Sequence, residues 1–203
     1  MLMANFLNSV DVDQTDLLMK FLNNRLKYGL ILDDFSNTFL INHFLKSENY
    51  RDAAKTGILM MLQEENSVPI ASEMALYSTL NYIMSENAQE SPWDPIPEIV
   101  EPEPEEEVKI RVEELENPDF DDHFDLVKKE HLLGKTLAFT AEGQKIDDSI
   151  IRNSLRLLGY AYYEKWSRVE EVLSESKEFS KSVLEQAAKY ANSVGHELGQ
   201  VSH

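Results

Sequence analysis

The residues whose types and spacing could support binding chemistry form one aromatic and basic cluster near the C-terminal end of the sequence. The cluster comprises Arg152, Arg156, Tyr160, Tyr162, Tyr163, Lys165, Trp166 and Arg168. Aromatic rings stack on nucleobases and guanidinium groups bind phosphates, so this pattern predicts a nucleic-acid contact. It is also typical of a contact between two helices, with aromatic side chains inside and basic ones facing solvent. The candidate RNA-binding residues here are Arg152, Arg156, Tyr160, Tyr163 and Arg168.

Two stretches resemble ligand-binding loops, but each lacks a glycine that the loop requires. Gly134-Lys-Thr136 resembles a phosphate-binding loop, yet Lys129 occupies the position five residues earlier where that loop needs glycine. The aspartates that begin at Asp119 resemble a calcium loop, but its sixth position holds Phe124. We therefore interpret these aspartates as the acidic start of a helix and predict no nucleotide or calcium site.

The sequence offers few other ligands or nucleophiles. It contains no cysteine, and no two of its five histidines stand three or four residues apart, so neither thiolate chemistry nor a zinc site has support. No run of eighteen apolar residues predicts a membrane-spanning helix. We expect no catalytic residue, metal, cofactor, small-molecule substrate or membrane contact, which is typical of a scaffold and not of an enzyme.

The charge of the chain is concentrated in its middle. The 203 residues include 37 acidic and 19 basic side chains, for a net charge of −18. Residues 1–85 contribute −4 and residues 131–203 contribute −1, whereas residues 86–130 hold 17 acids and 4 bases and contribute −13. Five prolines between positions 92 and 104 disfavour a helix there, so we predict an acidic Pro/Glu-rich linker over 87–116. In so acidic a chain any nucleic-acid contact must be local.

Apolar residues elsewhere recur at three- and four-residue steps, which predicts an all-α protein. The expected helices run from about 15 to 28, 34 to 46, 50 to 62, 72 to 84, 119 to 139, 148 to 162 and 167 to 184. Phe35 and His43 are expected on the buried side of the second helix. In the third helix, Ala53, Ala54 and Gly57 are small enough to allow close approach of a neighbouring helix.

Paired helices predict the domain organisation. Three pairs at about 15–46, 50–86 and 119–165, followed by a long final helix, are typical of helical-repeat proteins. The predicted division is a helical-repeat region over 1–86, the linker over 87–116, a C-terminal helical region over 117–195 and a frayed tail over 196–203.

One part of the first region resembles a known repeat. Tyr28-Gly-Leu-Ile-Leu-Asp33 resembles the closing turn of a pentatricopeptide repeat, with Leu32 replacing the usual proline, and Asp34–Phe44 resembles the first helix of the next repeat. This indicates one pentatricopeptide unit at about 34–68. A narrower resemblance is to the pentatricopeptide-type family of the mitochondrial small (28S) ribosomal subunit that is the twenty-seventh of the S series. The residues that carry it are KYGLILDDFSNTFLINHFLKSENYRDA, followed by MMLQEENSVP. The likeness covers about 15–86 and, more weakly, 131–175.

The resemblance implies a pentatricopeptide-like α-solenoid interrupted by an acidic linker and located in the mitochondrial matrix. It implies small-subunit rRNA and ribosomal proteins as partners, and a partial chain, because family members carry a transit segment and further repeats. In RNA-reading pentatricopeptide proteins the fifth residue of the first helix faces a base, which makes Thr38 a candidate RNA-binding residue. The closing turn over 67–70 lacks the aspartate that usually completes such a site.

Three functions remain open on the sequence alone. The first is a structural component of the mitochondrial small ribosomal subunit that supports translation. The second is a pentatricopeptide RNA-binding factor in mitochondrial RNA processing. The third is a generic helical protein-interaction scaffold, which suits the negative charge.

Overall fold

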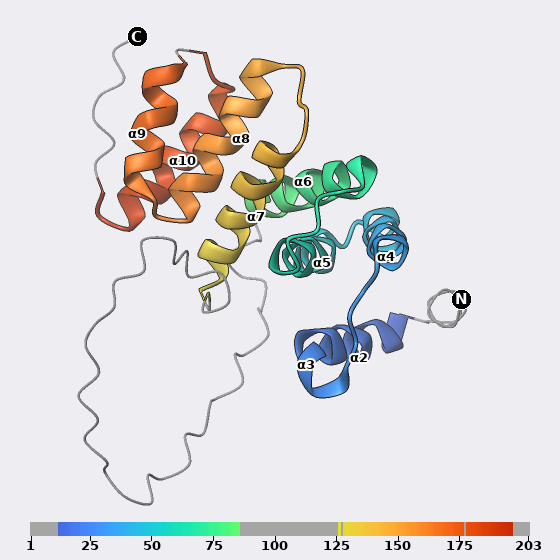
Figure 1. Cartoon of the computed structure of the whole chain (residues 1–203). Coiled ribbons are helices and arrows are strands. Elements are labelled where there is room, and N and C mark those ends of the chain that lie inside the picture. Colours follow the sequence, from blue (N-terminus) through green and yellow to red (C-terminus); the bar gives the residue numbers. More distant parts are fainter. Residues whose placement is uncertain (1–11, 86–125, 127, 177, 197–203) are drawn as a thin grey trace, which may run out of the picture.

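The structure is a computed structural model that describes residues 12–85, 126, 128–176 and 178–196 (Figure 1). Across these ranges the chain is helical and contains no strand, which confirms the all-α prediction. The elements in chain order are α2 (Val12–Asn23), α3 (Arg25–Tyr28), α4 (Asp34–Lys46), α5 (Tyr50–Leu62), α6 (Pro69–Met84), α7 (Lys129–Gly143), α8 (Ser149–Tyr162), α9 (Trp166–Glu175) and α10 (Lys181–Ser193). Of these helices, none combines the length and the apolar character needed to cross a membrane. The predicted linker and the residues after His196 lie outside the described ranges.

Local capping signals place several helix ends as predicted. The Asp33 side chain accepts a hydrogen bond from the Ser36 backbone N–H at 2.9 Å and begins α4, and Asp148 begins α8 in the same way through the Ile150 N–H at 2.8 Å. The expected start of α6 at Ser72 was wrong. Pro69 is the first residue of α6, because proline has no N–H to lose at that position and its φ already suits a helix.

Three other expected helices have different bounds. The first is broken at Asn24, which leaves the short α3 before Gly29. The helix expected from 119 begins instead at Lys129, since Leu126 and Lys128 are not helical, while 119–125 lie outside the described residues. The expected long final helix is two helices: Ser176 is extended, and the Ser180 N–H donates to the Ser154 hydroxyl of α8 at 2.8 Å. This bond to a distant helix holds the chain at the start of α10.

The central helix of the fold is α5. Every residue from Asp52 to Met61 is buried, and α5 supplies side chains to both hydrophobic clusters of the core. Its close approach to α6 is confirmed, because a Cβ on Gly57 would lie 3.1 Å from the Cβ of Ala75. The expectation for Phe35 and His43 was wrong: both are exposed, and α4 packs through Leu40, Ile41 and Phe44 instead.

The helices on the two sides of residues 86–125 pack against each other. α7 contacts both α5 and α6, as Figure 1 shows, and one hydrophobic cluster contains Ile83 of α6 together with Leu133 of α7. Beyond the end of α7, Gln144 donates from Nε2 to the backbone carbonyl of Asn66 at 2.9 Å. The helices before and after the acidic stretch therefore share a single core.

The tightest helix contact joins α7 to α8 at two glycines. A Cβ built on Gly134 would lie 2.4 Å from the backbone nitrogen of Tyr163, and one on Gly159 would lie 2.7 Å from that of Ala138. Both distances are far below van der Waals contact, so only glycine allows the two backbones to approach this closely.

We predict that Gly134→Ala lowers the free energy of unfolding by about 1–3 kcal/mol, because the added methyl group meets backbone atoms that cannot rotate away. Chemical denaturation measures this change. Ser174→Ala, at an exposed position of α9, is the control and should change stability little. Unchanged stability in Gly134→Ala would mean that the helices are further apart than described.

Candidate nucleic-acid interface

Three of the predicted RNA-binding residues lie on one face of α8. Arg152, Arg156 and Tyr160 follow one another at four-residue steps, so they share a side of the helix. The opposite side is buried against α7, α9 and α10 through residues such as Leu155 and Leu158. Burial of that side fixes the direction in which the arginines point.

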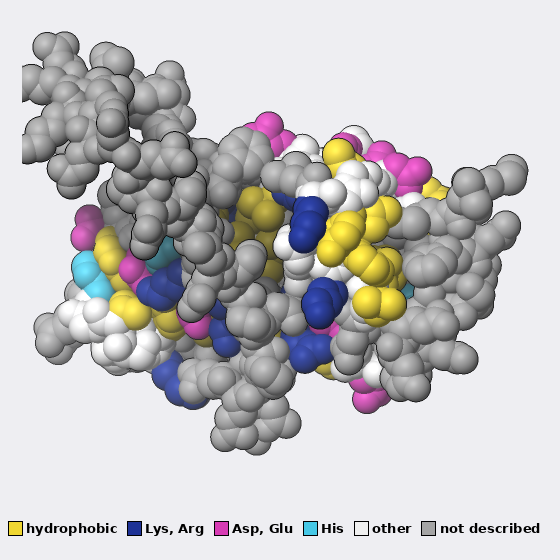
Figure 2. All heavy atoms as spheres, turned by 90° about the horizontal axis from the view of Figure 1, so that it is seen from below, with side chains coloured by type: hydrophobic (Ala, Val, Ile, Leu, Met, Phe, Trp, Pro, Cys, Tyr) yellow, Lys and Arg dark blue, Asp and Glu magenta, His cyan; other side chains and the backbone are white. Residues whose placement is uncertain are grey.

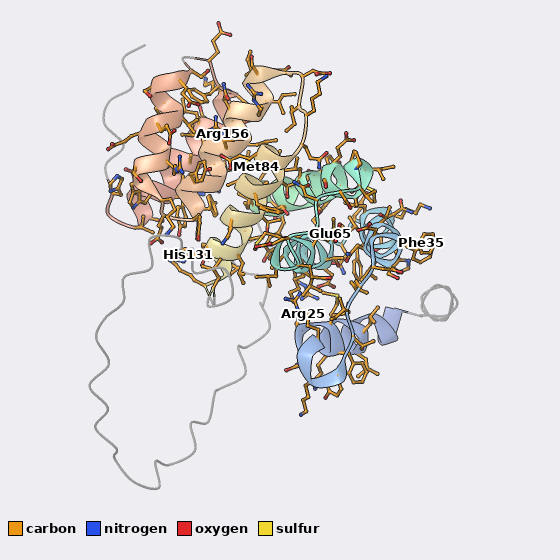
Figure 3. All side chains as sticks on the ribbon, viewed as in Figure 1. Arg25, Phe35, Glu65, Met84, His131 and Arg156 are labelled. Atoms are coloured by element: carbon orange, nitrogen blue, oxygen red, sulfur yellow. The ribbon has the colours of Figure 1, made fainter. Side chains whose placement is uncertain are left out.

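Arg156 and Tyr160 share the carboxylate of Glu142 at the end of α7. Nε of Arg156 lies 3.5 Å from Oε1 of Glu142, and its Nη1 donates to Oε2 of Glu175 at 2.9 Å. Partial burial lowers the pKa of Arg156, but Glu175 and Glu142 outweigh this and leave the pKa above its ordinary value. Burial and a hydrogen bond donated to Glu142 raise the pKa of Tyr160, so this phenol stays neutral. Figure 3 labels Arg156 within this group.

Arg168 of α9 belongs to the same group. Its Nη1 donates to Oε2 of Glu171 at 2.8 Å, and this bond raises the pKa of Arg168. The positive charges of Arg168 and Arg156 both act on the Tyr160 hydroxyl. The structure thus brings together three predicted residues, but it supplies carboxylate partners for both arginines. A phosphate would have to compete with those carboxylates.

Arg152 differs from the other two arginines. It is exposed, one turn before Arg156, and its side chain makes no hydrogen bond or ion pair with any residue that the structure describes. Its guanidinium group is therefore accessible to an anion without displacing an internal partner.

The remaining two candidates lie elsewhere. Tyr163 is buried, and the ammonium groups of Lys135 and Lys165 lie 5.5 and 4.9 Å from the centroid of its ring. Thr38 is the fifth residue of α4, and its hydroxyl donates to the Asp34 carbonyl at 2.7 Å. Neither side chain offers a free face or donor toward a base in this arrangement.

Sequence reasoning missed the acidic partners and one polar centre. Glu164 accepts hydrogen bonds from the Lys128 ammonium group and from the Tyr190 hydroxyl at 2.9 Å, and His131 lies 3.3 Å away. Burial raises the pKa of Glu164, but these hydrogen bonds outweigh it and lower the pKa below its ordinary value. The contacts join residues 26 to 36 positions apart, so no local spacing could have predicted them. Within the part of the chain that is described, no group of three His, Asp or Glu side chains is placed to hold a metal.

The described residues form a helical array with arginines on its surface, and a comparison with protein families defines the class of protein. The chain belongs to the ribosomal proteins of mitochondria. The matching family model is that of mitochondrial 28S ribosomal protein S27, and it covers residues 6–200. The chain is therefore a member of this family, located in mitochondria as a structural component of the small ribosomal subunit. This confirms the predicted family and favours the ribosomal hypothesis over the two alternatives.

We predict that Glu164→Gln lowers the free energy of unfolding by about 1 kcal/mol at pH 7, because it removes a charged hydrogen-bond acceptor in a partly exposed site. The folded-state pKa of Glu164 is lowered, so its contribution is complete above 4.5 and is lost as the pH falls through the lower folded value. Denaturation at pH 7 and at pH 3 measures this.

The matched control is Glu64→Gln. Glu64 also has a positive φ after a helix, but its side chain makes no hydrogen bond or ion pair with any described residue, so its replacement should change stability little at either pH. Equal effects of the two substitutions at pH 7 would contradict the stabilising role of Glu164.

Proposed function

We propose that this ribosomal protein acts in the mitochondrial matrix as a pentatricopeptide-like docking scaffold. Its outer helix faces bind neighbouring ribosomal proteins and rRNA, and it catalyses no reaction. Ribosomal protein families are in general not enzymes, which supports this assignment. The further support comes from the stacking of the helices and from two exposed surfaces.

The pattern of helix contacts supports a repeat architecture over α4 to α7. Each helix contacts the next, and in addition α4 contacts α6 and α5 contacts α7. Contacts between alternate helices are typical of stacked helical hairpins. In this proposal α4–α5 is the pentatricopeptide unit at about 34–68, α6–α7 is the second hairpin, and the acidic stretch over 87–116 is an insertion within that hairpin.

The observation that carries the docking function is an apolar stripe on α6. Ile70, Tyr77 and Met84 are spaced by seven residues, so they lie on one face of the helix, and they are 58, 54 and 39 % exposed. Large apolar side chains aligned on an exposed face are typical of a protein interaction site. In a ribosomal subunit the partner that fits this stripe is a neighbouring protein.

The rRNA contact in this proposal rests on the arginine face of α8 and α9. Arg152 supplies the accessible cation, while Arg156, Tyr160 and Arg168 lie beside it among carboxylates. Thr38 is the weaker candidate because its hydroxyl is already bonded to the helix backbone. Tyr163 is weaker because its ring is buried.

We predict that Ile70→Glu combined with Tyr77→Glu weakens incorporation into the small subunit, because two carboxylates replace the apolar stripe. Expression in cells that lack the endogenous protein, followed by gradient sedimentation, measures the fraction that co-migrates with the subunit. We expect most of the variant to remain in the free fractions. Leu17→Glu, at an exposed apolar residue of α2, is the matched control and should sediment normally. Normal incorporation of the double variant would overturn the docking role of this stripe.

We predict that Arg152→Glu reduces crosslinking of the chain to RNA within the subunit and leaves helicity unchanged, because the side chain makes no hydrogen bond or ion pair with the described residues. Loss of one phosphate contact should also lower the salt dependence of RNA binding by about one unit of slope. Lys145→Glu, which is likewise highly exposed, is the control. Undiminished crosslinking in Arg152→Glu would remove α8 from the RNA interface.

A further inference from the structure

A cavity of about 540 Å³ lies where the end of α6, the start of α7 and α10 meet. A volume of this size is in the range of protein pockets that bind a ligand or a few side chains. Met84, the last residue of α6, lines one side of the cavity. The first turn of α7, where Figure 3 labels His131, lines the other side. The candidate arginine face does not contribute to this cavity.

The inner wall of the cavity contains several apolar side chains and is firmly held. Ile83 and Leu133 are buried, and the rings of Tyr162 and Tyr190 stack with their centroids 4.2 Å apart. Gln186 of α10 donates to the Tyr162 hydroxyl at 2.8 Å, which ties α10 to α8. These contacts fix the shape of the wall before any ligand enters.

The rim of the cavity is basic. Three lysines, Lys128, Lys129 and Lys189, line it together with one acid, Glu130. Lys128 is paired with Glu164, and the Lys129 ammonium group lies 3.9 Å from the Glu130 carboxylate. Lys189 is exposed and has no partner among the residues that are described. Figure 2 shows Lys and Arg side chains at several separate places on the face seen from below, with apolar and acidic side chains among them. Apolar side chains in the wall and an unpaired lysine at the rim fit a peptide that combines acidic and apolar side chains.

The chain itself contains such a peptide between two residues that line the cavity. Residues 86–125 contain 16 acids and 2 bases, and the stretch from Trp93 to Val100 carries Trp93, Ile96, Ile99 and Val100 among acids. Ser85, which precedes this segment, and Lys128, which follows it, both line the cavity. A peptide joined to the rim at both ends meets the site at an effective concentration on the order of millimolar, well above that of a free partner.

We propose that this cavity is a binding site for the acidic segment of the same chain, with Trp93–Val100 against the apolar side chains of the wall and a neighbouring carboxylate on Lys189. The interaction is intramolecular, and it weakens as salt screens the lysine. When the segment is bound in this way, neither its carboxylates nor the lysine that they contact is available to RNA or to another partner.

Paramagnetic labelling tests this proposal in the full chain, because the absence of cysteine allows a single nitroxide to be placed cleanly. The label is attached at Ser193→Cys, whose side chain lines the cavity, or at Ser174→Cys on α9 as the control. We expect the amide resonances of Trp93–Val100 to lose intensity with the label at 193 and to keep most of it with the label at 174. Lys189→Glu should restore the intensity, whereas Lys181→Glu, on the same helix outside the cavity, should not.

Three results would overturn the proposal. Equal broadening from both labels, unchanged by Lys189→Glu, would mean that the segment has no preference for the cavity. Broadening that arises only between labelled and unlabelled molecules in a mixed sample would assign the cavity to a second copy. Shifts of the cavity resonances by a single-stranded RNA oligonucleotide, with no effect of the 193 label on Trp93–Val100, would assign it to RNA. Circular dichroism of each variant confirms that its helices are intact.

Discussion

The backbones of α7 and α8 touch where Gly134 meets the turn after Gly159, and the C-terminal half of the protein depends on this contact. No side chain separates the two helices there, so α8 is held at one distance and one rotation. That rotation directs Arg152 outward and places Arg156 and Tyr160 against Glu142. It also brings Tyr162 to α10, where it stacks on Tyr190 and forms the inner wall of the cavity.

The sequence predicted those features of the fold that depend on a few neighbouring residues. Asp33 and Asp148 cap helices through N–H groups two or three residues away, so their roles follow from local spacing. The break before α10 could not be predicted in this way, because Ser180 is held by Ser154 of another helix. Phe35 misled the prediction because apolar type alone does not say which side of α4 the partner helices occupy.

In the candidate RNA site, too, the sequence could indicate what depends on neighbouring residues but not what depends on contacts between helices. The sequence grouped Arg156 and Tyr160 in one aromatic and basic cluster, and family resemblance supplied the ribosomal context. Spacing could not indicate that Glu142 and Glu175 would neutralise that face, since each comes from a different helix. Arg152 therefore differs from Arg156 only through the tertiary fold. In an acidic chain, arginines with internal counter-ions stabilise the protein first and offer little net attraction to phosphate.

The shared core of α6 and α7 has a consequence for the integrity of the polypeptide. Ile83 and Leu133 pack together, and Gln144 is bonded to Asn66, without help from the peptide bonds between residues 86 and 125. The two halves of the protein are therefore held together by these contacts, whether or not the chain that links them is intact. Hydrolysis of one bond there would give two polypeptides that remain a single folded particle, as in a split protein whose pieces reassemble through a common interior.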